Sequence, residues 1–321
     1  MAYFIIFAKK MPVFSIVMPL YNKENYIENT LKSVFNQTFT DFEVLIINDG
    51  STDRSCEIVA SFTDSRVRLL HQTNQGASAA RNLGIQNAKA ANIAFLDADD
   101  YWYPNHLETL YLLEKEFPNC AIYCSRYQTK IAKNKAITTD FSYSFPNDFR
   151  GVIPDYFDSC YVNRVATSSS IFVRKAILEE NNCFNIAISS GQDLELWTKI
   201  AINHKVAISD KITAIYHFEA ANSLSKTPIT KKTLLDFSQF AAAEKENKSL
   251  KKFLDIYRLE YALQFKISGS STQSQFYLKD ITTKIPLKTK ILLQLPVLVL
   301  RFFLKIKHYL KRFGIDFTVY H

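Results

Sequence analysis

The sequence predicts an α/β fold, with a mostly parallel sheet flanked by helices and a helical extension at the C-terminal end. Between residues 14 and 99, short apolar runs alternate with longer segments of helical periodicity. From about Pro228 onward, helical patterns dominate. With 321 residues, the chain has room for about two domains, taking roughly 150 residues per domain.

Four apolar runs define the expected strands of the first half, and a helical segment separates each from the next. The runs are FSIVMPL at 14–20, FEVLIIND at 42–49, VRLLHQ at 67–72 and NIAFLDAD at 92–99, with helices expected over 24–35, 51–62 and 78–88. The second run is continuously apolar from Val44 to Ile47, which suits a strand covered by helices on both faces. Parallel neighbours need crossovers of about this length, so we expect these strands to pair in parallel.

The second half has a less regular pattern. Pro104 favours the start of a helix, because its missing N–H costs nothing in the first turn, and this helix should run to about Phe117. The other expected elements are strands at 121–128, 169–173 and 206–208 and a helix at 193–202.

Composition indicates a globular protein of a reducing compartment. Hydrophobic residues make up 47% of the chain and charged residues 22%, which excludes a largely disordered or collagen-like protein. The five cysteines are odd in number and form no C-x-x-C pair, which argues against a disulfide framework and a structural zinc site. The opening MAYFIIFAKK has its lysines after the apolar run, unlike a signal peptide. Because Met11 is an alternative start, residues 1–11 are a leader of uncertain status.

Polar side chains follow three of the expected strands where each strand ends. Tyr21 and Asn22 follow the first strand, the NDGSTD segment (48–53) ends the second, and DADD (97–100) ends the fourth. In an open parallel sheet, ligands bind in the crevice beyond the carboxyl ends of the strands. The three polar clusters should therefore meet at one site.

The acidic string after the fourth strand predicts a metal site or a solvated turn. Asp97 and Asp99 fall on the same side by the two-residue period of a strand. Repulsion between them can be offset by Mg²⁺ or Mn²⁺ that also contacts a phosphate. The alternative is a solvated turn before the next helix.

Two further residues have a functional and a structural interpretation. Asp49 could accept hydrogen bonds from a nucleobase, or it could belong to a turn before a helix. Arg81 suits a diphosphate or a carboxylate partner, or it could be a solvated helix cation. The chain contains no G-x-x-x-x-G-K-[ST], G-x-S-x-G or G-x-G-x-x-G motif. It therefore lacks the usual signatures of P-loop NTPases, α/β-hydrolases and dinucleotide dehydrogenases.

Four segments together resemble family 2 glycosyltransferases of the GT-A fold. They are SIVMPLYNKENYIENTLKSVFNQTF, FEVLIINDGSTDRS, NQGASAARNLGI and IAFLDADDYWYP, followed more weakly by TSSSIFVRKAIL and SSGQDLELWTKIA. The resemblance covers roughly residues 12–220. It implies a glycosyltransferase domain over 12–225, with nucleotide-sugar binding in 12–110, the acceptor side in 111–225, and a separate helical region over 226–321.

The resemblance also implies a role for each matching residue. Tyr21 and Asp49 would hold the base of a nucleoside-diphosphate sugar, with UDP as the expected nucleotide. Asp97 and Asp99 would form the D-x-D element that binds ribose, diphosphate and a divalent metal, Mn or Mg. Asp193 would be the catalytic base of an inverting transfer to a hydroxyl. The nucleotide-sugar set is Pro19, Tyr21, Glu24, Asp49, Arg81 and Asp97.

Two departures from the family pattern keep other functions open. Asn48 replaces the first Asp of the usual D-D-G, and Gln192 replaces the usual Glu before Asp193. Because of Gln192 and the half-matched motif at His217, a scaffold protein that binds a sugar nucleotide without catalysis remains the alternative function. A sugar-1-phosphate nucleotidyltransferase is disfavoured, because it expects a Gly-rich loop where this chain has LYNKEN.

The net charge of +8 is concentrated in the C-terminal region, since residues 282–315 contain no Asp or Glu and eight Lys or Arg. At about 100° per residue, one helix face collects apolar side chains and the other basic ones. The apolar set is Val299, Phe302, Phe303, Ile306, Leu310 and Phe313, and the basic set is Arg301, Lys305, His308 and Arg312. This pattern predicts a helix on an anionic membrane surface, or one packed on protein.

These expectations describe a cytoplasmic enzyme, peripheral to the inner face of the cell membrane. We expect hexosyl or N-acetylhexosaminyl transfer to a saccharide or lipid-linked saccharide in bacterial surface polysaccharide biosynthesis. No nucleic-acid partner is expected, because the charge is confined to one segment rather than spread over the folded domain.

Overall fold

The structure is a computed structural model that describes residues 11–132, 135–218 and 227–312. Residues 1–10 of the expected leader lie outside this part of the chain. Among the described residues, no helix combines the length and the apolar character that crossing a membrane requires.

One sheet organises the described part of the chain, with a parallel first half and a mixed second half. Its main order is β3-β2-β1-β4-β9-β6-β10-β5, with β7 beside β6 and β8 beside β10. The strands are β1 (Phe14–Leu20), β2 (Phe42–Asp49), β3 (Val67–Gln72), β4 (Asn92–Phe95), β5 (Tyr101–Trp102), β6 (Ile122–Ala132), β7 (Lys135–Thr138), β8 (Arg150–Val152), β9 (Ile171–Arg174) and β10 (Val206–His217).

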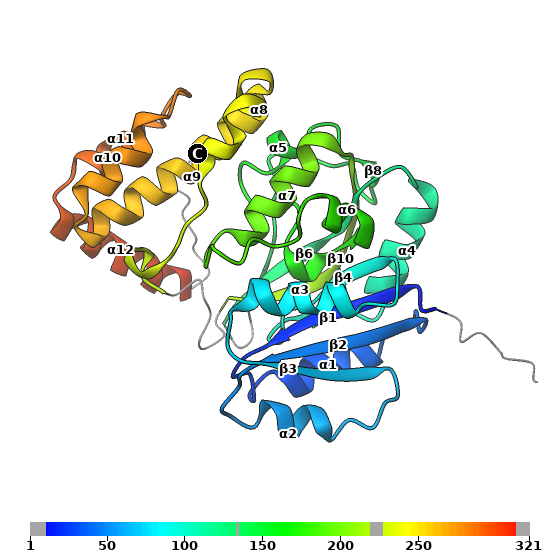
Figure 1. Cartoon of the computed structure of the whole chain (residues 1–321). Coiled ribbons are helices and arrows are strands. Elements are labelled where there is room, and N and C mark those ends of the chain that lie inside the picture. The colour runs from blue at the N-terminus through cyan, green and yellow to red at the C-terminus, as the bar shows by residue number, and fades with distance from the viewer. Residues whose placement is uncertain (1–10, 133–134, 219–226, 313–321) are drawn as a thin grey trace, which may run out of the picture.

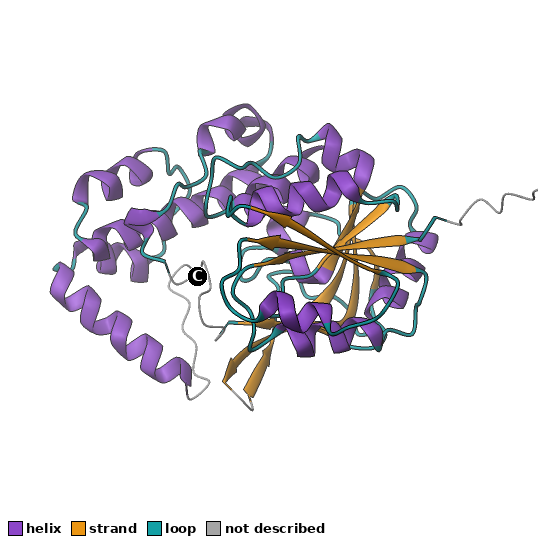
Figure 2. Cartoon of the chain, turned by 60° about the horizontal axis from the view of Figure 1, so that its bottom comes forward, coloured by secondary structure: helices purple, strands orange, loops and turns teal. Residues whose placement is uncertain are grey.

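Helices cover both faces of the sheet, and a group of helices follows it (Figures 1 and 2). The α-helices are α1 (Ile27–Phe35), α2 (Ser55–Ala60), α3 (Ala77–Asn87), α4 (His106–Glu116), α5 (Tyr156–Ser159), α6 (Lys175–Glu180), α7 (Gln192–Asn203), α8 (Ala241–Glu246), α9 (Lys248–Ser268), α10 (Ser271–Lys279), α11 (Leu287–Gln294) and α12 (Val297–Arg312). Short 3-10 turns are η1 (Ser168–Ser170), η3 (Ile229–Lys231) and η4 (Phe237–Phe240).

The predicted parallel unit is confirmed. β1 pairs in parallel with β2 and β4, and β2 pairs in parallel with β3. All eight residues of β2 are buried, as its continuous apolar run predicts. Helix α3 lies close to β1, since a Cβ at Gly84 would come within 2.4 Å of a Val17 methyl. The sheet becomes mixed where β9 inserts antiparallel between β4 and β6.

Several element boundaries differ from those predicted by the sequence: β4 ends at Phe95 and not at residue 99, and α1 begins at Ile27 and not at residue 24. Helix α2 begins at Ser55 instead of Ser51, because side chains hold the preceding loop: the Ser51 amide donates to Asn48 Oδ1 at 2.9 Å and the Ser55 amide to Asp53 Oδ1 at 3.0 Å. Strand β10 runs to His217 and not only to residue 208. Its register against β6 shifts after Ser209, and this irregularity obscures the strand pattern in the sequence.

The C-terminal helices lie beside the sheet domain (Figure 1); a polar cluster stabilises them internally, and aromatic side chains join them to the sheet domain. The Asp255 carboxylate in α9 accepts from Lys251 at 2.7 Å and from Arg258 at 3.0 Å. Phe253 of α9 lies 5.5 Å, ring to ring, from Phe157 of α5. This helical region is therefore fixed to the second half of the sheet domain.

Helix α12 places its apolar residues on two faces. Leu300 is buried, whereas Leu298 is 78% and Phe302 60% exposed. Arg301, predicted for the basic face, donates from Nε to the Ile267 carbonyl oxygen at 2.9 Å and so caps the C-terminal end of α9. The side chains of His308, Leu310 and Arg312 and all of Phe313 lie outside the described part, so this part of the expected pattern stays a prediction.

Candidate active site

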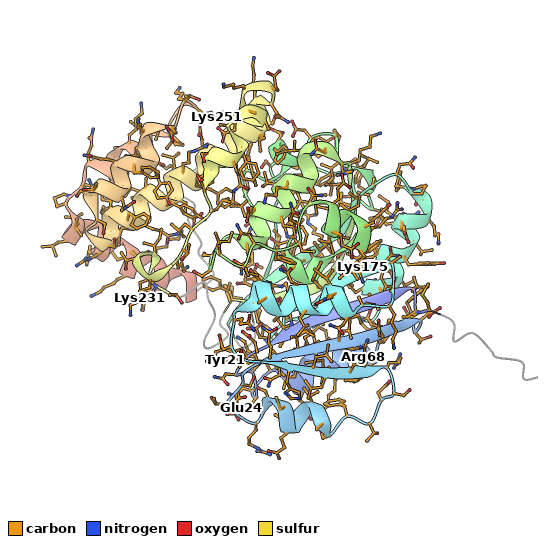
Figure 3. All side chains as sticks on the ribbon, in the orientation of Figure 1. Tyr21, Glu24, Arg68, Lys175, Lys231 and Lys251 are labelled. Atoms are coloured by element: carbon orange, nitrogen blue, oxygen red, sulfur yellow. The ribbon has the colours of Figure 1, made fainter. Side chains whose placement is uncertain are left out.

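A cavity of about 1040 Å³ lies where the parallel strands end, and it extends to the start of α7 and the side of α9. It brings together the three polar clusters of the first half with the residue expected to be the base. The predicted residues that line it are Pro19, Tyr21, Asp49, Arg81, Asp97, Asp99 and Asp193. Figure 3 shows Tyr21 and Glu24 at this end of the strands, with Arg68 toward the other end.

Asp49 organises the loop before α3. Its carboxylate, 3% exposed, accepts from Gln72 Nε2 at 2.7 Å, from the Gln75 amide at 2.8 Å and from the Gly76 amide at 2.9 Å. The left-handed backbone of Gly50 (φ 76°) lies against Asn74, because a Cβ there would come within 3.1 Å of the Asn74 nitrogen. These contacts fix Asp49 at the cavity wall with its carboxylate already oriented.

Arg81 pairs with the first carboxylate of the acidic string. Its Nη2 donates to Asp97 Oδ1 at 2.6 Å, and its guanidinium lies 5.3 Å from the centre of the Phe184 ring. Arg81 is 5% exposed, and its Nε has no hydrogen-bond partner within the described ranges. The interpretation of Arg81 as a solvated helix cation is therefore wrong, because the side chain is buried and points at the cavity.

Asp99 pairs with Lys23, a residue that the sequence analysis did not select. The Lys23 ammonium lies 2.6 Å from Asp99 Oδ2, and both side chains are largely buried. Burial raises the pKa of the Asp99 carboxyl and Asp97 raises it further, whereas Lys23 lowers it. Lys23 directly follows Tyr21 and Asn22, so the polar segment after β1 could have indicated that Lys23 belongs to the site.

Asp100 ties the acidic string to the second half of the chain. It is 1% exposed and accepts from Ser169 Oγ at 2.5 Å and from the His217 amide at 2.8 Å. Burial raises its pKa well above the usual range, and the neighbouring carboxylates Asp99 and Asp97 add to this rise. The His217 ring contacts the Asp99 carbonyl oxygen through Nδ1, which must carry the proton because a carbonyl oxygen only accepts.

Asp193 lies in the first turn of α7, next to Arg164, a second residue that no sequence pattern indicated. Arg164 donates from Nη1 to Asp193 Oδ2 at 2.6 Å, and Asp193 raises the pKa of this guanidinium well above its ordinary value. The other carboxylate oxygen accepts from the Leu194 amide at 2.8 Å. Helix α7 starts after Gly191, whose φ of 88° turns the chain into the cavity wall.

Glu24 does not line the cavity. Its carboxylate accepts from the Arg54 amide at 3.1 Å, and its own amide donates to Asp53 Oδ2 at 3.0 Å. It therefore joins the segment after β1 to the loop after β2, and its support of the nucleotide pocket stays a prediction.

The carboxylates at the end of β4 fit a divalent cation held jointly with a phosphate. Asp97 and Asp99 line the same cavity, and their mutual repulsion contributes to the raised pKa of Asp99. Within the described ranges, no group of three or more His, Cys, Asp or Glu side chains could form a complete metal site. Magnesium commonly binds through one or two carboxylates plus substrate phosphates, which is the arrangement that this pair allows.

Comparison with known proteins finds a matching family model and similar sequences. The model of the family described as "Glycosyl transferase family 2" matches residues 15–180, just over half of the chain. A protein named uncharacterized glycosyltransferase from Rickettsia felis is 35% identical over 198 residues, which cover 61% of this chain and 31% of that protein. The uncharacterized glycosyltransferase YibD of Escherichia coli is 47% identical over 104 residues, covering 32% of this chain and 30% of YibD. The chain thus matches about a third of the length of these relatives.

The fold is similar to that of S. aureus TarS. The TarS structure in complex with UDP-GlcNAc has a TM-score of 0.62 at 18% identity, covering 87% of this chain and 83% of that one. The TarS structure in complex with UDP has a TM-score of 0.54 at 23% identity, covering 64% of this chain and 60% of that one. The GT-A fold predicted from the sequence is therefore confirmed.

Proposed function

Because the chain belongs to glycosyl transferase family 2, we propose that this glycosyltransferase is an inverting enzyme that transfers a sugar from UDP to a saccharide hydroxyl. The observation that carries the proposal is the single cavity that joins Asp49, the Asp97 and Asp99 pair, and Asp193. A transfer of this kind needs a nucleotide site and a proton acceptor on opposite sides of one sugar. The cavity offers both.

The strand ends bind the donor. Tyr21 is 44% exposed at the cavity wall, where its ring can stack on a base, and Asp49 can accept from the base N–H edge. The TarS structures in complex with UDP and UDP-GlcNAc support a uridine nucleotide, since this chain shares their fold. Arg81 faces the diphosphate and stabilises its negative charge.

Asp97 and Asp99 hold a divalent cation, Mn²⁺ or Mg²⁺, together with the diphosphate. A bound cation would stabilise the negative charge that develops on the departing UDP. Arg81 pairs with Asp97 and Lys23 pairs with Asp99, each at 2.6 Å. When the donor binds, these two cations can contact the phosphates instead and so orient the diphosphate.

Asp193 accepts the proton of the attacking hydroxyl. It lines the same cavity as the strand ends, in the first turn of α7, and Arg164 orients its carboxylate. The hydroxyl oxygen bonds to the anomeric carbon while the bond from that carbon to the UDP oxygen breaks, and the proton goes to Asp193. One such in-line step inverts the configuration, and no protein nucleophile is needed.

The enzyme acts on a saccharide or lipid-linked saccharide at the inner face of the cell membrane, in bacterial surface polysaccharide biosynthesis. The exposed side chains of α12 support this location, because Leu298, Phe302, Phe303 and Tyr309 are 46–78% exposed among basic residues. Such a helix binds anionic lipid through buried apolar area and charge attraction. The transferred group is a hexose or an N-acetylhexosamine.

Calorimetric titration with UDP-GlcNAc, UDP-glucose and GDP-mannose, each with and without MnCl₂, tests the proposal. We expect a UDP sugar to bind in a manganese-dependent way and to be hydrolysed slowly. Equal affinity for GDP-mannose would contradict the assignment of the base site. Binding without any hydrolysis or transfer would favour the sugar-nucleotide-binding scaffold instead.

A further inference from the structure

The far wall of the cavity is made by the C-terminal helical region and not by the sheet domain. Residues of α9 line it together with Lys232, which follows η3, and Lys307 of α12. The same cavity contains Asp193, so the C-terminal wall belongs to the space into which an acceptor must reach.

This wall is fixed against the start of α7. The Ser189 amide donates to the Thr233 carbonyl oxygen at 2.9 Å, and the Thr233 amide donates to Ser189 Oγ at 3.0 Å. Helix α9 also approaches closely, because a Cβ at Gly191 would lie 3.0 Å from Tyr261 Oη. The distance between α9 and the Asp193 carboxylate is therefore set by direct packing.

One face of α9 carries polar side chains to the cavity. Tyr257, Glu260 and Gln264 recur at intervals of three and four residues and so share that face. Gln264 Nε2 donates to Glu260 Oε1 at 2.9 Å, which orients the carboxylate beside a carboxamide. A few convergent polar groups in a concave site provide specificity for a ligand.

Glu260 is half-buried in the cavity wall, which distinguishes it from an exposed surface acid. Burial raises its pKa, whereas Arg164, Lys307 and Lys232 lower it. Burial likewise raises the pKa of the neighbouring Tyr257 well above its usual range. Partly desolvating a carboxylate is costly unless it makes hydrogen bonds, and a polyhydroxylated molecule in the cavity can donate several to it.

We propose that Glu260, with Gln264 and Tyr257, binds hydroxyl groups of the saccharide acceptor, so that α9 forms the acceptor subsite. This inference rests on the proposed function, and it moves acceptor recognition from residues 111–225 into the C-terminal region. The carboxylate accepts from one sugar hydroxyl, the Gln264 amide bridges a second, and a third hydroxyl is then presented to Asp193.

Steady-state kinetics of Glu260→Gln and Gln264→Ala test the subsite, with Glu246→Gln as the control. Glu246 is an exposed acid of α8 that does not line the cavity. UDP-GlcNAc with MnCl₂ serves as donor, and a panel of octyl β-glucoside, octyl β-galactoside and octyl N-acetyl-β-glucosaminide serves as acceptor. Donor hydrolysis without acceptor is measured for each variant, and it also reports whether the variant folds.

We expect Glu260→Gln to raise the acceptor KM about tenfold, as the loss of a charged hydrogen bond does, with donor KM and hydrolysis within about twofold of wild type. The Gln264→Ala variant should change the acceptor KM in the same direction, and the control should change nothing. Unchanged transfer, or equal losses of hydrolysis and transfer, would overturn the inference and leave the proposed function standing. Hydrolysis by the wild type without transfer to any glycoside would also overturn it. Absence of both activities would refute the proposed function, and the inference with it.

Discussion

At the scale of single residues, ion pairs connect segments that are distant in the sequence. Lys23 reaches Asp99 across 76 positions, and Arg164 reaches Asp193 across 29. Lys23 lies where the diphosphate is proposed to bind, and Arg164 lies beside the proposed proton acceptor. The sequence could predict the carboxylates, because strand ends and a family motif mark them. It could not predict Arg164, because that residue lies in an irregular loop whose path depends on tertiary packing.

Replacing Asp99 by Ala tests the cation site. We expect manganese-dependent hydrolysis of UDP-GlcNAc to fall by about 10²- to 10³-fold, the usual effect of losing one group that stabilises developing charge. The variant should still fold, but its Tm should fall, because the largely buried Lys23 ammonium loses its partner at 2.6 Å. Hydrolysis is measured by UDP release.

Asp64→Ala is the matched control, since Asp64 pairs with Arg66 away from the cavity. Excess chelator should abolish wild-type hydrolysis. Full activity of the wild type in chelator would refute the role of the cation, whatever the variant does.

At the scale of elements, the length of β2 was predicted correctly because its apolar run is uninterrupted, and the length of β10 wrongly because charged residues interrupt its run. Strands β1, β2 and β3 match the predicted ranges. β1 and β2 are buried along almost their whole length, whereas β3, at the edge of the sheet, is only half-buried. The irregular part of β10 contains Asp210 and Lys211, whose charges interrupt the apolar run. Asp210 is partly buried by an ion pair with Arg126 at 2.6 Å, a partner that no local pattern indicates.

Helix α12 gives a prediction at this scale. Replacing Leu298 and Phe302 by Ser should weaken binding to vesicles of phosphatidylglycerol and phosphatidylcholine by about tenfold for each residue, because both side chains are exposed and would bury apolar area in lipid. Cosedimentation at several protein concentrations measures the binding.

Leu112→Ser is the control, because Leu112 is 47% exposed on α4 and lies outside the C-terminal region. Added salt should weaken binding of the wild type, since charges near the surface are screened within about 8 to 10 Å. If the wild type ignores these vesicles and the double variant aggregates less, α12 instead packs on another protein.

At the scale of the whole molecule, a helical region lies beside a sheet domain (Figures 1 and 2). Residues of both parts line one cavity. The sequence predicted both parts and their order, since strand and helix periodicities differ. It did not predict that α9 would form a wall of the site, because the resemblance that located the motifs ends near residue 220. Contacts such as the bridge between Ser190 and Leu234 depend on how the two parts dock.

The stability of the whole molecule should depend on pH through His106. This ring is fully buried against Trp102, and burial lowers its pKa to about 3. Below pH 6.5 the unfolded chain takes up a proton that the folded protein does not, so stability is complete above that pH and falls as the pH falls. From pH 6.5 to 5 the loss from this group should be about 2 kcal/mol.

Urea unfolding of wild type and His106→Gln at pH 7 and pH 5 measures this effect. The variant should lose less stability between the two pH values, even if it is less stable at pH 7. An identical loss in both proteins would show that His106 does not carry the acid sensitivity.

The most direct test of the central claim, catalysis by one base facing a nucleotide site, is single-turnover transfer from UDP-GlcNAc by Asp193→Asn. We expect the rate to fall by about 10² to 10⁴ while the donor Kd stays within about twofold of wild type, because general-base catalysis is lost and the strand-end site is untouched. A Kd that rises as much as the rate falls would contradict the claim, since Asp193 would then bind the nucleotide or hold the fold.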